Sequence, residues 1–446
     1  MNIVIVGDGK VGATLVEHLS MEGHNVVVID RDQKKVEQMV NSYDVMGICG
    51  NGANCELQLE AGVDTSELFV AATSSDELNI LSCLMAKKAG AKHTIARVRN
   101  PDYLNQLPFF KDALGLSMVV NPEYDAANEI AKVLRFPNAI NIETFYRGLV
   151  DLVELRIDEG NPLCNMQLTD IFNTFDVKIL VCAVQRKNEV IIPRGDFVLK
   201  SGDKIHVTAP RGVLVSFMKK LKIYKHRTRD IMIIGGGKMG YYLARQLCET
   251  GGYNIKIIEN DLERCEKLCE VLPGADVIHG DGTDRATLLE QGLDNQDAFV
   301  ALTDNSETNI LACLAAKRMG VVKTIAEVGN IGYIGMAESL DIGAVINKKK
   351  IAASYIYQLL LDADVENVKC LTFANADVAE FNVRPGARIT KSAVKDIMLP
   401  RGVTIGGLIR NKEAILVTGN TRIEADDHVV VFCLEGMIKT VEKFFI

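Results

Sequence analysis

This sequence has no dense block of lysine and arginine. They number 50, against 58 aspartates and glutamates, which gives a net charge of −8 at pH 7. Binding to nucleic acid requires clustered cations that neutralise phosphates, so this composition disfavours a nucleic-acid-binding protein. The basic run at residues 219–229 is short, and we interpret it as a solvated linker rather than a nucleic-acid patch.

Long apolar segments are also missing. The longest stretches without a charged residue, such as 351–361, are shorter than the ~20 residues that cross a bilayer. The N-terminus enters a predicted strand directly, without the pattern of a signal peptide. We therefore expect a cytoplasmic protein without a membrane-spanning helix.

The cysteines do not have the spacing of a metal site. The chain has 11 of them, scattered, with no pair of C-x-x-C elements. Cys265 and Cys269 share one face of a predicted helix, but a metal would need two more ligands nearby. We interpret them as small buried side chains. An odd count without a secretory signal indicates reduced thiols.

The chain does contain an internal duplication. Residues 72–100, ATSSDELNILSCLMAKKAGAKHTIARVRN, align with residues 302–330, LTDNSETNILACLAAKRMGVVKTIAEVGN, at an offset of 230. CGNGAN after Ile48 matches HGDGTD after Ile278 at the same offset, and a glycine loop recurs at an offset of 228. The chain is therefore two copies of one unit of about 225 residues.

Each copy begins with short apolar, β-branched runs that alternate with amphipathic helical segments. This pattern predicts an α/β fold, a Rossmann-like, doubly wound parallel sheet of about 135 residues. The rest of each copy is β-rich, which predicts a small α+β cap. The cap strands are expected at 149–155, 178–186, 189–193 and 203–209, and at 369–378, 404–410, 413–419 and 427–433. The predicted domains are 1–138, 139–222, a linker at 223–229, 230–364 and 365–446.

Each copy opens with a glycine loop between a strand and a helix. The loops read GDGKVG at 7–12 and GGGKMG at 235–240. In a dinucleotide-binding loop the first glycine permits a tight turn, the second lets a pyrophosphate approach the backbone, and the third lets helix and strand pack closely. The anion then meets the helix N-terminus. The candidate loop residues are Gly7, Asp8, Gly9, Lys10, Val11 and Gly12, and Gly235, Gly236, Gly237, Lys238, Met239 and Gly240.

An acidic residue ends the next strand of each copy. Asp30 lies 18 residues past Gly12, and Glu259 lies 19 past Gly240. A carboxylate at this position accepts hydrogen bonds from the adenosine ribose, and it would repel a 2′-phosphate. We therefore expect NAD(H) rather than NADP(H). The alternative is that the glycines serve only the turn between strand and helix.

Polar residues at other strand ends are further candidates. Asn51 and Asp281 follow the third strand of their copies and could border the adenine. Thr73 and Thr303 follow the fourth strand and could reach ribose or phosphate. The alternative for all four is a turn-forming role.

The fifth strand ends differently in the two copies. Arg97 could counter a phosphate, but its equivalent is Glu327. We therefore expect the first cleft to prefer the more highly charged nucleotide. The alternative is that both side chains point to solvent or to a neighbouring subunit.

Signs of catalysis are scarce. The sequence contains no H-E-x-x-H and no G-x-S-x-G, and none of its seven histidines lies in a paired arrangement in both copies. A dehydrogenase needs an acid or base beside the nicotinamide, and the caps look too small to enclose a substrate. Duplicated nucleotide sites without a catalytic partner favour a sensor, with an NAD-dependent oxidoreductase as the alternative.

The order of motifs resembles a known family. A glycine loop, an acid, G-N/D-G and T-x5-N, followed by a β-rich cap, resembles the RCK (KTN) domain with its C-terminal companion. Two such units in one chain resemble the TrkA family of regulatory subunits of Trk potassium-uptake systems, over essentially the whole length. The T-x5-N element spans residues 73–79 and 303–309.

The resemblance implies several properties. Such proteins bind NAD(H), and often ATP or ADP, in the Rossmann clefts. They form homo-oligomeric rings of RCK domains under a TrkH-like membrane potassium transporter, on the cytoplasmic face of the inner membrane, and the nucleotide gates that transporter. The helices after the sixth strand, which match 123–135 and 349–362, pack across dimers in the family. We therefore expect a non-enzymatic sensor; a nucleotide-binding scaffold without a membrane partner is a further alternative.

Overall fold

The computed structural model divides the described chain into two compact units that do not follow chain order. The first comprises Met1–Asp125 with Ile351–Leu360, and the second comprises Ala126–Lys350 with Leu361–Ile446. Most of the linker expected at 223–229, and residues 138, 139 and 364 at the expected domain boundaries, lie outside the described residues. The described residues are 1–21, 23–106, 109, 113–135, 141–145, 149–187, 189–221, 228–360, 365–371, 376–434 and 436–446.

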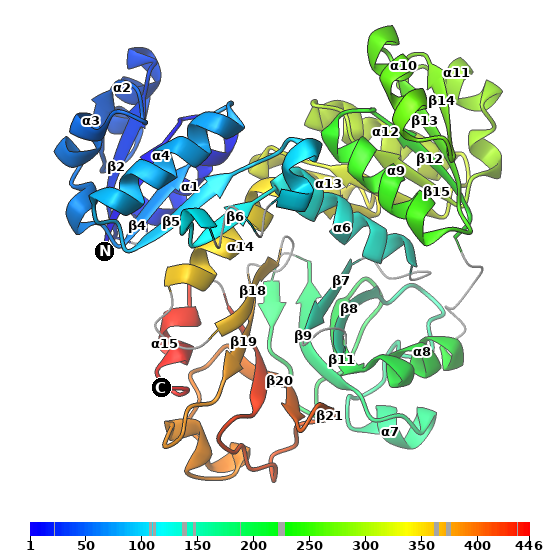
Figure 1. Cartoon of the computed structure of the whole chain (residues 1–446). Helices are drawn as coiled ribbons and strands as arrows, with labels where there is room; N and C mark the ends of the chain where they lie inside the picture. The colour runs from blue at the N-terminus through cyan, green and yellow to red at the C-terminus, as the bar shows by residue number, and fades with distance from the viewer. Residues whose placement is uncertain are drawn as a thin grey trace. The chain divides into compact units, whose positions relative to one another are not determined.

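The first copy begins with a six-stranded parallel sheet, as predicted (Figure 1). Its strand order is β3-β2-β1-β4-β5-β6, so the order in which strands are added reverses between β1 and β4. The strands are β1 (Asn2–Val6), β2 (Asn25–Asp30), β3 (Met46–Cys49), β4 (Leu68–Ala71), β5 (His93–Arg97) and β6 (Met118–Val120). The helices are α1 (Lys10–Met21), α2 (Gln33–Ser42), α3 (Cys55–Glu60), α4 (Asp76–Ala89) and α6 (Pro122–Arg135), with 3₁₀ turns η1 (Val63–Thr65) and η2 (Pro101–Gln106).

The second copy repeats this topology in the order β14-β13-β12-β15-β16-β17. All neighbouring strands are again parallel. The strands are β12 (Asp230–Ile234), β13 (Asn254–Glu259), β14 (Ala275–His279), β15 (Ala298–Ala301), β16 (Lys323–Glu327) and β17 (Ala344–Ile346). The helices are α9 (Lys238–Thr250), α10 (Leu262–Val271), α11 (Arg285–Glu290), α12 (Ser306–Arg318), α13 (Ile334–Ser339) and α14 (Lys348–Leu360), with η4 (Leu293–Asn295) and η5 (Ile331–Tyr333).

Each cap is built on a five-stranded antiparallel sheet, in the orders β10-β9-β11-β8-β7 and β18-β19-β22-β20-β21. The run 369–378, predicted as one strand, is divided between two paired strands, β18 and β19. The first cap has β7 (Asn141–Phe145), β8 (Val150–Arg156), β9 (Leu180–Arg186), β10 (Glu189–Ile191) and β11 (Lys204–Pro210), with α7 (Asp170–Phe175) and α8 (Arg211–Lys220). The second has β18 (Val365–Leu371), β19 (Ala376–Asn382), β20 (Val403–Arg410), β21 (Glu413–Ile415) and β22 (His428–Leu434), with α15 (Ile438–Glu442), η6 (Arg388–Thr390) and η7 (Val394–Asp396).

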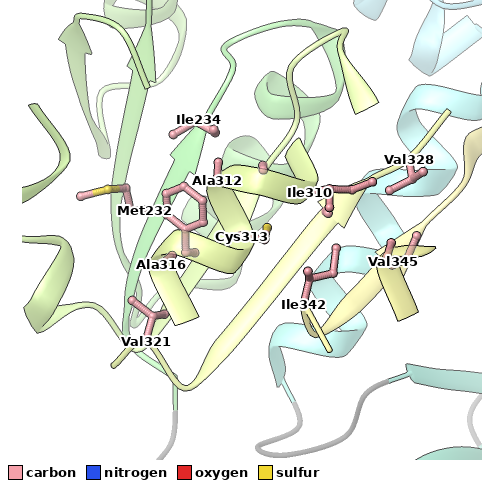
Figure 2. Packing of buried hydrophobic residues seen from close by; sticks show 14 of the residues in the cluster. Met232, Ile234, Ile310, Ala312, Cys313, Ala316, Val321, Val328, Ile342 and Val345 are labelled. Atoms are coloured by element: carbon pink, nitrogen blue, oxygen red, sulfur yellow. The ribbon is translucent and has the colours of Figure 1, made fainter. Parts of the chain in front are cut away.

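Both faces of the parallel sheets are buried. Alternate side chains of a strand point to opposite faces, and each set packs in an apolar cluster. In β1, Ile3 and Ile5 belong to one apolar cluster, whereas Val4 and Val6 belong to another. The second sheet has an equivalent cluster, in which strand residues such as Met232 pack against Cys313 and Ala316 of α12 (Figure 2). This two-sided burial explains why the strands read as continuous apolar runs.

Helix α14 completes the core of the first copy although it follows the second sheet in sequence. Ala352 and Ala353 are 4% and 6% exposed and belong to the same cluster as Ile3 and Ile5 of β1. Helix α6, from residue 126 onward, belongs instead to the second compact unit. The resemblance implied that these helices pack across dimers; within this chain they are exchanged between the two copies.

Candidate functional site

Each parallel sheet carries a cleft at the carboxyl ends of its strands, where the strand order reverses. Ligands of doubly wound folds bind at this position. The first cleft has a volume of about 350 Å³ and the second about 470 Å³. Of the predicted site residues, the clefts bring together Gly7, Gly9, Asp30, Thr73 and Arg97, and Gly235, Gly237, Glu259, Asp281 and Thr303.

The glycine loops have the conformation that their spacing predicts. Gly7 and Gly235 have φ near +97° and +96°, a region that disfavours other residues. A methyl group on Gly12 would collide with the carbonyl oxygen of Gly7. At Gly9 it would meet only the carbonyl of Ala72, 3.9 Å away. The middle glycine therefore leaves open space beside the helix, where a pyrophosphate would have to lie.

Other loop residues point elsewhere. Val11 and Met239 are 4% and 6% exposed, and Val11 packs in the apolar core, so they do not line the clefts. Lys238 is exposed at the start of α9, while the side chain of Lys10 lies outside the described residues. Gly236 faces α10, since a methyl group there would collide with Leu268.

The two strand-end acids bind their own loops. Asp30 accepts hydrogen bonds from the backbone N–H groups of Asp8 at 2.6 Å and Asp32 at 2.9 Å. Glu259 accepts equivalent bonds from Gly236 at 2.6 Å and Asp261 at 3.0 Å. These bonds fix each carboxylate at the edge of its cleft. A carboxylate has about four acceptor positions, so ribose hydroxyls could still be bound.

Asp8 distinguishes the first loop from the second. Its side chain is 8% exposed, and one carboxyl oxygen is buried without a hydrogen-bond partner. Burial, followed by the nearby charge of Asp30, raises the pKa of Asp8 from 3.8 to about 6. Gly236 occupies this position in the second copy, so only the first loop contains such a group.

The T-x5-N element is a structural link. The buried side chain of Asn79 accepts hydrogen bonds from the backbone N–H of Thr73 at 2.8 Å and from its hydroxyl at 2.6 Å, and donates to the carbonyl of Arg97 at 2.8 Å. Asn309 makes the same three bonds, to Thr303 and Glu327. The element thus joins the ends of two neighbouring strands to the helix between them, and the threonine hydroxyl at the cleft is oriented by this bond.

Arg97 and Glu327 differ in charge, and so do the residues with which they pair. Arg97 lies 2.6 Å from Glu123, and both side chains are largely buried. Glu327 lies 3.5 Å from Lys348 and is likewise buried. The reversal at the strand end is therefore compensated at the start of the following helix. Arg97 still lines the first cleft, whereas Glu327 does not line the second.

Asn51 and Asp281 form turns at the cleft edge. Asn51 accepts a hydrogen bond from the N–H of Ala53 at 3.3 Å. Asp281 accepts bonds from the N–H and hydroxyl of Thr283 at 2.8 and 2.7 Å and lines the second cleft. Both turn-forming and ligand-binding roles are compatible with these positions.

Sequence reasoning missed several charged and polar residues at the rims. Arg31 and Ser74 come directly after the predicted Asp30 and Thr73. Their place next to a predicted site residue at a strand end is the sequence signal that could have identified them. The residues it missed are Arg31, Lys35, Ser74 and Arg99 in the first cleft, and Asn260, Arg264, Asp304 and Thr308 in the second.

Neither a metal-binding cluster nor a membrane-spanning helix is found among the described residues. No group of three or more histidine, cysteine, aspartate or glutamate side chains there has the arrangement of a metal site. Cys265 is buried, and its thiol donates a weak hydrogen bond to the carbonyl of Glu259 at 3.4 Å. The interpretation of Cys269 as a buried side chain is wrong, because Cys269 lies on the exposed face of α10. None of the helices described combines the length and apolar character needed to cross a bilayer.

Family models match both copies. The TrkA-N domain matches residues 3–122 and 231–348, and the TrkA-C domain matches residues 152–222 and 378–446. The Trk system potassium uptake protein TrkA homolog of Archaeoglobus fulgidus is 33% identical over 100% of both chains. The Trk system potassium uptake protein TrkA of Halomonas elongata is 31% identical over 100% of this chain and 98% of the relative.

Solved structures share the fold at lower identity. The GsuK RCK domain superposes with a TM-score of 0.64 and 16% identity, over 100% of this chain and 94% of that chain. The GsuK channel bound to NAD superposes with a TM-score of 0.62 and 16% identity, over 100% of this chain and 78% of that chain. These similarities establish a tandem pair of Rossmann-like domains with antiparallel caps.

Proposed function

The chain belongs to the TrkA family, and from this premise we propose that it is a nucleotide-sensing regulatory subunit that gates a membrane potassium-uptake transporter of the Trk type. One observation carries the proposal: a complete glycine-loop cleft occurs twice in a chain whose relatives are named Trk potassium uptake proteins. We infer that the protein acts without catalysis.

The ligand we propose for the clefts is NAD(H), with ATP or ADP as further ligands. The open space at Gly9 and Gly237, the start of a helix directly behind it, and a carboxylate at the cleft edge support this. The GsuK channel has been solved bound to NAD and GsuK also bound to ADP, on the same fold.

The regulated partner we propose is a TrkH-like membrane subunit, beneath which the chain assembles as a homo-oligomeric ring on the cytoplasmic face. A nucleotide changes the state of such a ring only through its different affinities for the two states. The exchange of α14 into the first core supports coupling within one chain, because the domain that carries the second cleft also supplies part of the first domain.

The test blocks both clefts with substitutions that the fold should accommodate. Side chains at Gly9 and Gly237 meet open space, so Gly9→Asp and Gly237→Asp should fold while placing a carboxylate where the pyrophosphate would lie. The double variant should bind no NADH, NAD, ATP or ADP in calorimetric titrations. It should also lose nucleotide-dependent potassium uptake in cells that carry the transporter. Unchanged titrations would contradict the assignment of the clefts.

Two further measurements separate the alternatives. The intact protein should sediment with membranes only in cells that express the transporter; equal sedimentation without it would rule out the peripheral-subunit role. An NAD-dependent oxidoreductase should change NADH absorbance with some substrate of a metabolite panel, and we expect no such change.

A further inference from the structure

The two clefts have opposite electrostatic character. At four equivalent rim positions, the first copy is more positive by one charge than the second. At each of these positions the residue of at least one copy lines its cleft. The four exchanges, first copy to second, are Arg31 to Asn260, Asn51 to Asp281, Ser74 to Asp304 and Arg99 to Gly329.

The remaining charges do not reverse this contrast. Lys35 in the first cleft is matched by Arg264 in the second. The exchange of Asp8 for Gly236 acts in the opposite sense, but the carboxyl of Asp8 is buried and does not line the cleft. The reversal at Arg97 is compensated by Glu123, as described above.

Arg99 remains a donor to the cleft despite its acidic neighbour. Its Nε lies 3.5 Å from Asp76, whose other oxygen accepts the backbone N–H groups of Arg99 and Asn100 at 2.8 and 2.7 Å. A terminal nitrogen of Arg99 donates to the carbonyl of Ser74, which places the guanidinium across the rim. A planar guanidinium at this position suits a phosphate group.

The second copy has no equivalent of the pair formed by Arg99 and Asp76, since Gly329 and Ser306 occupy these positions. Ser306 replaces Asp76 and accepts the backbone N–H of Gly329 at 3.0 Å, so the loop is held without any charged side chain. The neighbouring rim residue Asp304 is exposed and lines the cleft, as does Asp281. Two carboxylates thus line the second cleft, whereas Arg31 and Arg99 line the first.

We propose that the two clefts select nucleotides by charge: the first accepts nucleoside di- and triphosphates, and the second favours NAD(H) over triphosphates. This rests on the proposed nucleotide-binding function. A triphosphate carries more negative charge than the pyrophosphate of a dinucleotide, so it gains more from Arg31 and Arg99 and loses more to Asp281 and Asp304. Exposed charges are screened by salt, so each exchange should alter affinity only a few-fold, and the four should add.

The experiment measures each cleft in the full chain. Gly237→Asp leaves only the first cleft open, and Gly9→Asp leaves only the second. With NADH and ATP as probes, we expect the ratio of ATP affinity to NADH affinity to be about tenfold or more higher at the first cleft in 0.1 M salt. The difference should shrink as salt is raised.

Reciprocal exchanges test the residues. With the first cleft silenced, the double change Asp281→Asn and Asp304→Ser should raise ATP affinity about fivefold and NADH affinity less. With the second cleft silenced, Asn51→Asp and Ser74→Asp should lower ATP affinity by a similar factor. The matched control is Asn305→Ser, which installs the uncharged residue of the first copy in the second cleft and should leave the ratio unchanged.

The outcomes separate the two proposals. If the unaltered chain binds neither NADH nor ATP, the proposed function fails. If both bind and the ratio agrees within twofold at the two clefts, only charge selection fails. Should a silenced variant not fold, NADH fluorescence of the unaltered chain decides: ATP should displace about half of the bound NADH in a first phase and the rest only at much higher concentration. A single phase would overturn the selection.

Discussion

At the scale of single residues, equivalent positions of the two copies carry different side chains although the glycine loops make the same backbone hydrogen bond. Asp8 and Gly236 occupy equivalent positions of the two loops, and each donates its backbone N–H to the strand-end acid at 2.6 Å. The side chain added in the first copy is a buried carboxyl beside another carboxylate. The loop therefore tolerates an acid that its surroundings disfavour, which makes its protonation relevant to stability.

The first prediction concerns the pH dependence of Asp8. A carboxyl whose folded-state pKa is raised holds its proton more tightly when folded. It therefore contributes stability below the unfolded value of 3.8, and this is lost as pH rises through about 6. Asp8→Asn should thus unfold like the parent near pH 4 but be more stable at pH 8, by roughly 2–3 kcal/mol. Calorimetry at both pH values checks this, and an equal difference at both would contradict it.

The second prediction concerns the pair of Arg97 and Glu123. Arg97→Glu alone opposes two largely buried carboxylates and should destabilise the first unit by roughly 2–4 kcal/mol. Adding Glu123→Lys recreates the polarity of the second copy, where Glu327 pairs with a lysine, and should recover more than half of the loss. Thermal unfolding of both variants provides the measurement. A double variant no more stable than the single one would show that the pair does not interact as described.

At the scale of elements, the T-x5-N link connects the strand ends that border each cleft. It joins the ends of β4 and β5 to α4 in the first copy, and those of β15 and β16 to α12 in the second, through an asparagine with no exposed surface. Because the bonds use backbone groups at the carboxyl ends of the strands, they place the cleft-lining threonine relative to the glycine loop.

The third prediction removes this link. Asn309→Ala leaves the N–H of Thr303 and the carbonyl of Glu327 without this partner, and should cost about 2–4 kcal/mol of stability. The control is Asn295→Ala, at an exposed asparagine in the same domain, which should change stability by less than about 0.5 kcal/mol. Equal melting temperatures for the two variants would contradict a structural role of the link.

At the scale of the whole molecule, the two sequence copies are not the two units of folding. Helix α14 carries Ala352 and Ala353 into the core of the first unit, while the chain from residue 126 to 222 belongs to the second. The duplication has thus been combined with an exchange of helices, so that one core of the first sheet includes residues from the second half of the sequence.

The fourth prediction follows from this exchange. A fragment of residues 1–222 lacks α14 and exposes the apolar surface that α14 covers in the full chain. We expect it to melt at a lower temperature than the intact protein and to self-associate in size-exclusion chromatography. Co-expression with residues 228–446 should restore a complex of one copy of each. A monomeric fragment as stable as the intact chain would contradict the exchange.

The sequence by itself determined the repeat, the parallel sheets, the β-rich caps and the resemblance to the family. These depend on local patterns: apolar periodicity defines strands buried on both faces, and glycine spacing defines a turn in which Gly7 needs its positive φ. The candidate positions Asp30 and Glu259 followed in the same way, since a strand end after a glycine loop has one place in this topology.

Only the tertiary structure decided which distant groups meet. The partner of Arg97 is 26 residues away, and the helix that covers β1 begins more than 300 residues later, so no local pattern predicts either contact. Arg99 lies at the rim because the fold brings the loop after β5 beside the end of β4 at one cleft. The physical reason is that charge and burial act through space, and the fold alone determines those distances.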